Sequence, residues 1–193
     1  MTLTIPFVLL AGYLLGSIPA GYLAGRWLQG VDIRTLGSGS TGATNVLRQF
    51  GKGPALVVFL VDVLKGTAAV VLAKAVLQPL GLPLDGGAAV ASDSWVVAAG
   101  LAALAGHIWP VWLGWRGGKA VATALGMLLG FLVYAAIMGS AAAVVRSQTG
   151  VVLDPWQPAW VWLWAPASMI LLGALAGVAP ALKAYRTDVA SGL

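Results

Sequence analysis

The chain has 193 residues, a mean hydropathy of +0.91 and only 9% charged residues, far below the roughly 25% usual in soluble domains. It contains no cysteine and one histidine, which excludes disulfides and thiolate zinc sites and disfavours a histidine-rich metal site. The net charge of +5 is spread over several short segments, which indicates membrane orientation and anionic ligands and argues against nucleic acid as a partner. We therefore expect a single all-α domain, residues 1–193, embedded in the lipid bilayer.

Apolar runs long enough to span a bilayer, about 20 residues each, recur along the chain. They lie at about 3–25, 54–78, 94–113, 120–145 and 158–182. At least five spans are visible, and seven are expected if the last two long runs are divided. No Lys or Arg precedes the first run, so we interpret it as a retained span kinked at Pro19 and not as a signal peptide. Glycines spaced by four, at 12 and 16 and at 126 and 130, predict close helix contacts.

Basic residues concentrate in alternate connections between these runs. They are Arg26, Arg34, Arg48 and Lys52 after the first run, Arg116 and Lys119 after the third, and Lys183 and Arg186 in the tail, whereas the second connection carries Asp85 and Asp93. By the positive-inside bias the N-terminus lies outside and the C-terminus in the cytoplasm, which an odd number of spans satisfies. With seven spans, Arg146 is better placed inside as well.

The first basic connection contains the polar stretch LGSGSTGATNVLR, residues 36–48. Glycines let backbone N–H groups converge on one point, and hydroxyls add donors, so the stretch can form an anion-binding nest closed by an arginine. A nucleotide P-loop is excluded because Ala43 stands where that loop needs lysine and no strand precedes it. The candidate phosphate ligands are Ser38, Gly39, Ser40, Gly42, Thr44, Asn45 and Arg48. A flexible linker is the structural alternative.

A second polar element, GWRGGKAVATALG at residues 114–126, places Gly117, Gly118 and Lys119 where a helix begins. Free N–H groups and the positive end of the helix dipole favour anions there, and Lys119 adds a full charge. The alternative is that Lys119 only sets the orientation. Both polar elements are expected on the cytoplasmic side, so both can face one site.

Three of the ionisable side chains inside the apolar runs are candidates for a site. Asp62 and Lys65 in VDVLKG share one helix face, and His107 in GHIWPVW lies near the cytoplasmic end of the third run. Such groups are costly in a bilayer and often mark a site. The structural alternatives are an ion pair that snorkels to the interface and a packed histidine.

Familiar catalytic arrangements are absent from the sequence. No aspartate follows His107 at the spacing of a base and its orienting group, since Trp112 stands five positions on, and there is no G-x-S-x-G nucleophile motif. An enzyme built from these residues would act mainly by positioning phosphate-bearing substrates and stabilising charge.

The motifs GSIPAGYLAGR, LGSGSTGATNVLR, DVLKG and AGHIWPVWLGWRGGKAVATALG resemble those of the bacterial acyl-phosphate:glycerol-3-phosphate acyltransferases, the PlsY family. The resemblance runs from about Gly16 to Gly126, over half the chain and in the family's order. It implies a seven-helix bundle of the bacterial inner membrane, with its active site facing the cytoplasm and with neither metal nor other cofactor.

The resemblance also implies a reaction. An acyl group passes from acyl phosphate to the 1-hydroxyl of glycerol 3-phosphate, giving lysophosphatidic acid for phospholipid synthesis, so an upstream enzyme must form acyl phosphate. Ser38, Thr44, Asn45, Arg48 and Lys119 would hold the donor phosphate, while Gly117 and Gly118 would let the backbone approach. Asp62, Lys65 and His107 match family positions near the site.

Three positions depart from the family pattern. Ser40 replaces an asparagine, and Thr187 and Ala190 replace a histidine and an asparagine that help to hold glycerol 3-phosphate in the family. Two alternatives therefore stay open: an inactive homologue, and a transporter of a phosphorylated solute built on broken helices.

Overall fold

The computed structural model describes residues 3–77, 86–150, 167–168 and 171. This part of the chain is helical and contains no strand. Four of its segments are long and apolar enough to cross a membrane: Thr4–Gln29, Lys52–Leu77, Asp93–Leu113 and Val121–Thr149. They coincide with the first four predicted runs, which confirms the all-α membrane fold. The predicted run at 158–182 falls almost entirely outside the described residues, so the number of spans and the orientation stay predictions.

The first span is broken in two. Helix α1 (Thr4–Gly16) is separated from α2 (Ala20–Gln29) by Ser17, Ile18 and Pro19. Proline lacks the N–H group that would continue the α1 ladder, and Pro19 adopts φ −92° and ψ 64°, outside the helical region. The kink predicted at Pro19 is therefore a full interruption, and it places non-helical backbone inside a membrane-spanning segment.

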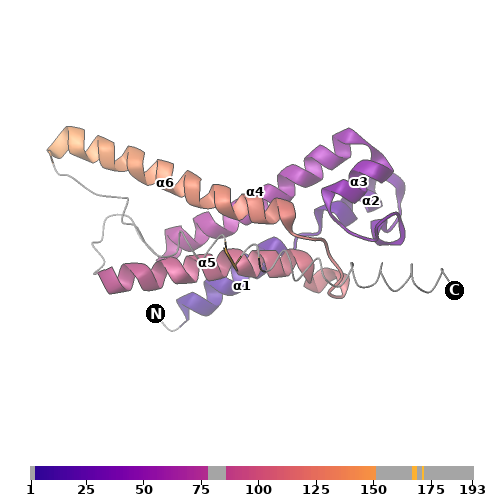
Figure 1. Ribbon diagram of the computed structural model, residues 1–193, viewed down its shortest axis with the longest axis horizontal. Helices are drawn as coiled ribbons and strands as arrows, with labels where there is room; N and C mark the ends of the chain where they lie inside the picture. The colour runs from indigo at the N-terminus through magenta and orange to yellow at the C-terminus, as the bar shows by residue number, and fades with distance from the viewer. Residues whose placement is uncertain (1–2, 78–85, 151–166, 169–170, 172–193) are drawn as a thin grey trace.

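Two short helices follow before the second span. They are the 3₁₀ turn η1 (Ile33–Thr35) and α3 (Ala43–Phe50), and the chain turns after α3 at Gly51, whose φ of +86° favours glycine. Ile33 and Val46 pack with Val58 in a small apolar cluster. In Figure 1, α2 and α3 consequently lie together beside one end of the next long helix.

Three long helices form the body of the bundle. They are α4 (Lys52–Leu77), α5 (Gly86–Ile108) and α6 (Val121–Thr149), with the short turn η2 (Val111–Leu113) between the last two. Helix α4 packs against both α5 and α6, and α1 packs against α5 (Figure 1). The main core cluster includes Val70 from α4, Val97 and Leu104 from α5, and Met127 from α6.

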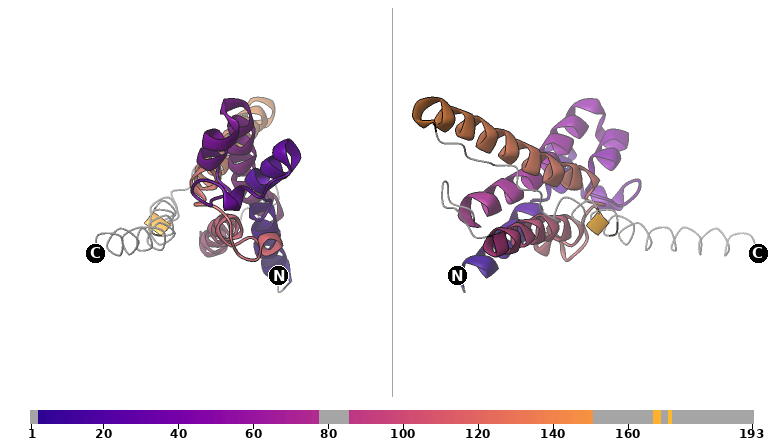
Figure 2. Two further views of the ribbon diagram at one scale, coloured as in Figure 1. Left: turned by 90° about the vertical axis from the view of Figure 1, so that its right-hand side faces the viewer. Right: turned by 60° about the vertical axis from the view of Figure 1, so that its left-hand side comes forward.

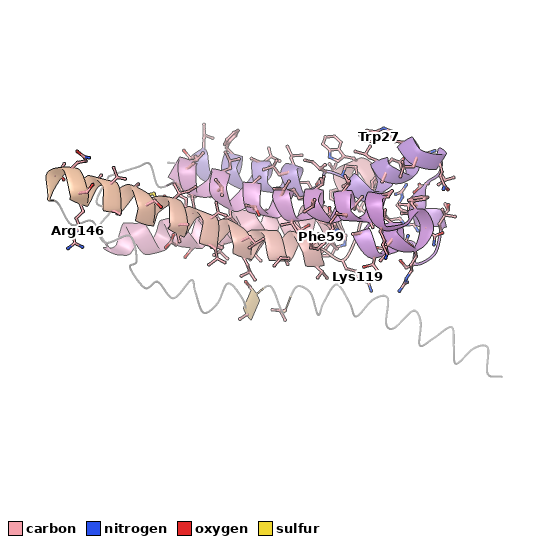
Figure 3. All side chains as sticks on the ribbon, turned by 90° about the horizontal axis from the view of Figure 1, so that it is seen from above. Trp27, Phe59, Lys119 and Arg146 are labelled. Atoms are coloured by element: carbon pink, nitrogen blue, oxygen red, sulfur yellow. The ribbon has the colours of Figure 1, made fainter. Side chains whose placement is uncertain are left out.

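Helix α6 runs without a break and extends past the other helices at the end away from α2 and α3 (Figure 2). Its Arg146 consequently lies at the opposite end of the bundle from Lys119 and Trp27 (Figure 3). With seven spans, Arg146 is expected on the cytoplasmic side of the membrane. That placement requires a break within the apolar run at 120–145. The structure has none there: α6 continues through its glycines from Val121 to Thr149, and no proline interrupts it.

Helix α4 has two distinct faces. Leu56, Leu60 and Leu64, spaced by four, are exposed on the side that lipid would cover. Asp62 and Lys65 are buried on the side that packs against the other helices. The two charged side chains therefore point into the bundle and not toward lipid.

Glycines allow the close approach of these helices. A Cβ added to Gly126 in α6 would collide with the carbonyl of Val63 in α4, and one on Gly66 in α4 would collide with the carbonyl of Thr123 in α6. One on Gly16 in α1 would meet the carbonyl of Ala103 in α5. The glycine contacts predicted for positions 16 and 126 are thus confirmed as places where a side chain has no room.

We expect Gly126→Val to lower the free energy of unfolding by about 2 to 3 kcal/mol, because the added side chain forces α6 away from α4. Thermal unfolding of the purified protein in detergent measures the effect. The control is Leu125→Val, which places the same side chain on the neighbouring exposed position. Equal unfolding temperatures for the two variants would contradict this packing.

Candidate active site

The broken first span is tied to α4 by a buried lysine. Lys65 Nζ donates a hydrogen bond of 3.0 Å to the carbonyl of Ile18, in the break between α1 and α2. The Lys65 side chain is only 3% exposed, so it does not snorkel to the interface. The Ile18 carbonyl also accepts the N–H of Ala20 at 3.1 Å, so the lysine adds a second hydrogen bond that anchors the non-helical backbone to α4.

Asp62 lies at the centre of a cluster of charged and polar groups. Its Oδ1 atom is 2.7 Å from Lys65 Nζ, one helical turn away, and 3.4 Å from Nδ1 of His107 in α5. Neither contact has hydrogen-bond geometry, so Oδ1 has no hydrogen-bond partner among the described residues. The cluster is an ion pair with one unsatisfied acceptor, and it is buried where an isolated charge would be very costly.

His107 also contacts α6 and the turn before it. Its Nδ1 atom lies 3.2 Å from the hydroxyl of the buried Thr123. Gly117 and Gly118 donate their N–H groups to the carbonyls of Ile108 and His107, at 3.1 and 3.0 Å. A Cβ on Gly118 would overlap the imidazole at Nε2. Both glycines are therefore needed because the turn lies directly on the end of α5. That they also let a ligand approach the backbone stays a prediction.

A small cavity adjoins this cluster. It measures about 10 Å³, close to the least volume that holds one water molecule. Its lining combines the helix break with the charged cluster: Gly16, Ser17, Ile18, Pro19, Ala20, Thr41, Asp62, Lys65, His107 and Pro110. The polar groups of three separate spans therefore meet at one point.

The polar stretch 36–48 is a folded loop, organised by Asn45. The Asn45 side chain is buried, and its Nδ2 lies within hydrogen-bond distance of the carbonyls of Ile33, Leu36 and Ser40, at 3.2, 3.1 and 2.9 Å. Its Oδ1 accepts the N–H of Ser38 at 3.2 Å. Asn45 therefore holds the loop in shape, and the interpretation of this stretch as a flexible linker does not fit its hydrogen bonds.

An arginine joins the two polar elements. Arg34 pairs with Asp32 at 2.7 Å, and its second guanidinium nitrogen donates to the carbonyl of Leu113 in η2, also at 2.7 Å. The hydrogen bonds from Arg34 hold the pKa of the Asp32 carboxyl below its ordinary value of 3.8. The loop at 36–48 and the turn at 114–119 thus belong to one end of the bundle, as the charge pattern predicted.

Several basic residues at this end have no protein partner. Arg34 is paired and Arg26 bonds the Tyr22 hydroxyl, but Arg48 and Lys119 are exposed and make no ion pair or hydrogen bond within the described residues. Figure 3 shows Lys119 at the same end as Trp27. Cations that no protein group neutralises are available to an anionic ligand.

The predicted residues divide into two groups. Asp62, Lys65, His107 and Asn45 are buried and bonded to one another or to the loop, whereas Ser38, Gly39, Thr44, Arg48 and Lys119 are exposed. Ser40 and Gly42 lie between, with the Gly42 N–H donating to the Ser40 hydroxyl at 3.2 Å. Thr187 and Ala190 lie outside the described residues.

Sequence reasoning missed Thr41, Thr123 and the carbonyl of Ile18. All three contribute to the buried cluster or its cavity. The available signal was position: Thr123 lies four residues after Lys119, and Ile18 directly precedes the proline that breaks the first span.

We expect Asn45→Ala to loosen residues 33–45, because three carbonyls and one N–H lose their shared partner at a cost of about 2 kcal/mol. Hydrogen exchange of this segment should accelerate. Thr44→Ala, at the exposed neighbouring position, should leave the exchange of the loop unchanged. The organising role of Asn45 would be refuted by equal protection in both variants.

Comparison with known proteins supports these observations. The family model described as glycerol-3-phosphate acyltransferase matches residues 6–182. Proteins named glycerol-3-phosphate acyltransferase are similar to the chain: that of Synechococcus sp. (strain CC9902) is 66% identical over 131 residues, covering 67% of this chain and 58% of the relative. That of Prochlorococcus marinus (strain MIT 9313) is 70% identical over 113 residues, covering 58% and 49%. The chain thus spans about half the length of the curated relatives that it matches.

Two solved structures share the fold. Both are crystal structures of PlsY (YgiH), an integral membrane glycerol 3-phosphate acyltransferase. The lysophosphatidic acid form gives a TM-score of 0.61 at 28% identity, covering 97% of this chain and 92% of the other. The glycerol 3-phosphate form gives 0.56 at 29% identity, covering 97% and 90%. Because the family model matches nearly the whole of this chain, residues 6–182, the chain belongs to the glycerol-3-phosphate acyltransferase family.

Proposed function

We propose that this protein transfers a fatty acyl group from acyl phosphate to the 1-hydroxyl of glycerol 3-phosphate, releasing phosphate and forming lysophosphatidic acid. The family match and the named relatives support the reaction, and the solved structure in a glycerol 3-phosphate form supports the acceptor. The observation that carries the proposal for this chain is the hydrogen bond from Arg34 to the carbonyl of Leu113. It ties the segment before the polar loop to the turn before Lys119, so that Arg48 and Lys119 lie at the same end of the bundle.

The exposed polar groups form the phosphate-binding part of the site. Arg48 offers a forked pair of donors and Lys119 a point charge, and neither is neutralised by a described protein group. The hydroxyls of Ser38, Ser40 and Thr44 add donors, while Gly39 and Gly42 keep the loop backbone accessible. In this proposal Asn45 acts by holding the loop that carries these groups.

Charge stabilisation is the main catalytic device. When the acyl–oxygen bond breaks, negative charge builds up on the leaving phosphate, and preorganised cations stabilise that charge. Arg48 and Lys119 are therefore the proposed catalytic cations. Asp62, Lys65 and His107 form the buried wall behind them, and the two glycines at 117 and 118 join that wall to Lys119.

The polar end would face the cytoplasm of a bacterium, across its inner membrane. The basic residues after the first and third spans support this orientation, with the N-terminus outside and the C-terminus inside a bundle of five to seven spans. The donor would then come from a cytoplasmic enzyme that forms acyl phosphate.

The absence of cysteine makes the topology directly measurable. We expect Arg116→Cys to react with a membrane-impermeant maleimide only in inverted vesicles, because it lies in the turn at the polar end. Ser147→Cys, near the other end of α6, should react only in right-side-out vesicles. The reverse pattern would contradict a cytoplasmic site.

We expect Arg48→Gln and Lys119→Gln each to lower kcat/KM, raising the corresponding activation free energy by about 2 to 4 kcal/mol, the cost of removing one preorganised charge from the transition state. The assay measures lysophosphatidate formed from palmitoyl phosphate and labelled glycerol 3-phosphate by protein in lipid. Lys52→Gln is the control, since it removes an exposed cation from the same end and Lys52 has no role in the proposed site.

The outcomes separate the alternatives. Product from wild type, with large losses in the first two variants only, supports the proposal. Binding of palmitoyl phosphate without turnover would mean an inactive homologue that lacks the acceptor half, as the substitutions at Thr187 and Ala190 suggest. Equal losses in all three variants would mean that general surface charge, and not this site, governs the rate.

A further inference from the structure

The aromatic ring of Tyr22, in α2, is shared by two guanidinium groups. The guanidinium carbon of Arg26 is 5.4 Å from the centre of the ring, and that of Arg34 is 5.3 Å from it. Both distances lie within the range of about 6 Å over which the negative face of an aromatic ring attracts a cation. A tyrosine outside both polar elements therefore interacts with the arginine that joins them.

The chain folds back on α2 and so brings Arg34 to this ring. Gly30 ends α2 with a φ of +69°, and the N–H of Val31 then bonds the carbonyl of Gly25 at 3.3 Å. A Cβ on Gly25 would lie only 3.0 Å from the carbonyl oxygen of Val31. Because the returning segment packs this closely on α2, the side chain of Arg34 reaches the ring of Tyr22.

All three nitrogens of the Arg34 guanidinium are hydrogen-bonded. Nε and one terminal nitrogen donate to the carboxylate of Asp32 at 2.7 to 3.2 Å, and the other terminal nitrogen donates to the carbonyl of Leu113 at 2.7 Å. These bonds hold the edges of the planar group and leave its faces to other contacts. The cation–π contact with Tyr22 is thus an additional restraint on the guanidinium that makes the bond to Leu113.

Arg26 uses the same ring in a different way. Its Nε donates to the Tyr22 hydroxyl at 3.0 Å, and a terminal nitrogen donates to the carbonyl of Gly30 at 3.2 Å. Both partners belong to α2 or to the residue that ends it, so these bonds do not connect α2 to the turn before Lys119. The hydroxyl of Tyr22 therefore serves Arg26, whereas the ring also serves Arg34.

The charges of this cluster make the ring important for Arg34. Asp32 supplies one negative charge against two guanidinium groups, which repel each other. The negative face of the ring offsets part of this repulsion. Without the ring, the repulsion favours conformations in which Arg34 points away from Arg26, at the expense of its bond to Leu113.

We propose that Tyr22 is a positioning residue whose ring holds Arg34 on the carbonyl of Leu113. This bond sets the distance between the two proposed catalytic cations, because Arg34 leads into the loop before Arg48 and Leu113 lies in the turn before Lys119. The inference rests on the proposed acyl transfer. A phosphate held by two cations during its departure requires them at one fixed spacing.

Kinetics separate the ring from its hydroxyl. Tyr22→Leu should lower kcat/KM for palmitoyl phosphate by about 3- to 30-fold, the range that one cation–π contact covers. Tyr22→Phe should keep the wild-type value, because it retains the ring and loses only the bond from Arg26. Arg26→Gln is the matched control: it removes the other cation from the same ring and should leave kcat/KM unchanged. Equal losses in Tyr22→Leu and Tyr22→Phe would overturn the inference.

A double-mutant cycle tests whether Tyr22 acts through Arg34. In an Arg34→Gln background, Tyr22→Leu should lower kcat/KM by less than about twofold more, because the bond that the ring supports is already lost. Losses that multiply in the double variant would show that the ring acts independently of Arg34, which contradicts the proposal.

The absence of cysteine allows the spacing to be measured without any activity. Spin labels on Leu47→Cys in α3 and Val111→Cys in η2, both at exposed positions, report the distance between these elements by pulsed electron paramagnetic resonance. We expect one narrow distance distribution with tyrosine or with Tyr22→Phe, and a broader one with Tyr22→Leu. A distribution that stays narrow in Tyr22→Leu would refute the positioning role.

Two further outcomes are also informative. If Tyr22→Leu does not fold, Tyr22→Met keeps most of the side-chain volume without the ring, and it should give the same broadening. A wild-type protein that shows the narrow distribution but no acyl transfer would refute the proposed function, and the labels would still decide whether Tyr22 fixes the loop relative to the turn.

Discussion

A carboxylate buried within a membrane-spanning helix is the constraint on which the rest of the structure depends. Asp62 lies on the inner face of α4, where an unpaired charge would cost several kcal/mol. Lys65 supplies the opposite charge, and the same ammonium group bonds the carbonyl of Ile18. One lysine therefore compensates a buried charge and anchors the non-helical backbone to α4, so the break at Pro19 and the ion pair stabilise each other.

This arrangement gives the site a rigid interior and an open exterior. Inside, the ion pair and His107 connect the first span, α4 and α5, and Thr123 adds α6. Outside, Asn45 fixes the polar loop, and Arg34 ties the loop to the turn before α6. The exposed cations thus stand on segments that are held at several points, which preorganisation of charge requires.

The sequence predicted the helices and the polar end well, because apolar length and charge distribution follow directly from the bilayer. It did not separate residues that face a ligand from residues that hold the loop: Asn45 in a glycine-rich stretch fits both roles, and only its burial and four hydrogen bonds decide. Lys65 does not snorkel because its ammonium group bonds the carbonyl of Ile18, 47 residues earlier in the chain. A contact between residues so far apart cannot be read from a local sequence pattern. Thr123 gave only a positional signal, four residues after Lys119, because single hydroxyls are common in apolar helices.

The central claim is that the exposed cations at one end of the bundle hold the phosphate of the acyl donor beside bound glycerol 3-phosphate. A structure of this protein with glycerol 3-phosphate and a non-hydrolysable acyl phosphonate tests it most directly. The account predicts the phosphonate against Arg48 and Lys119, with the 1-hydroxyl of glycerol 3-phosphate facing its acyl end. A phosphonate bound away from both cations would contradict it.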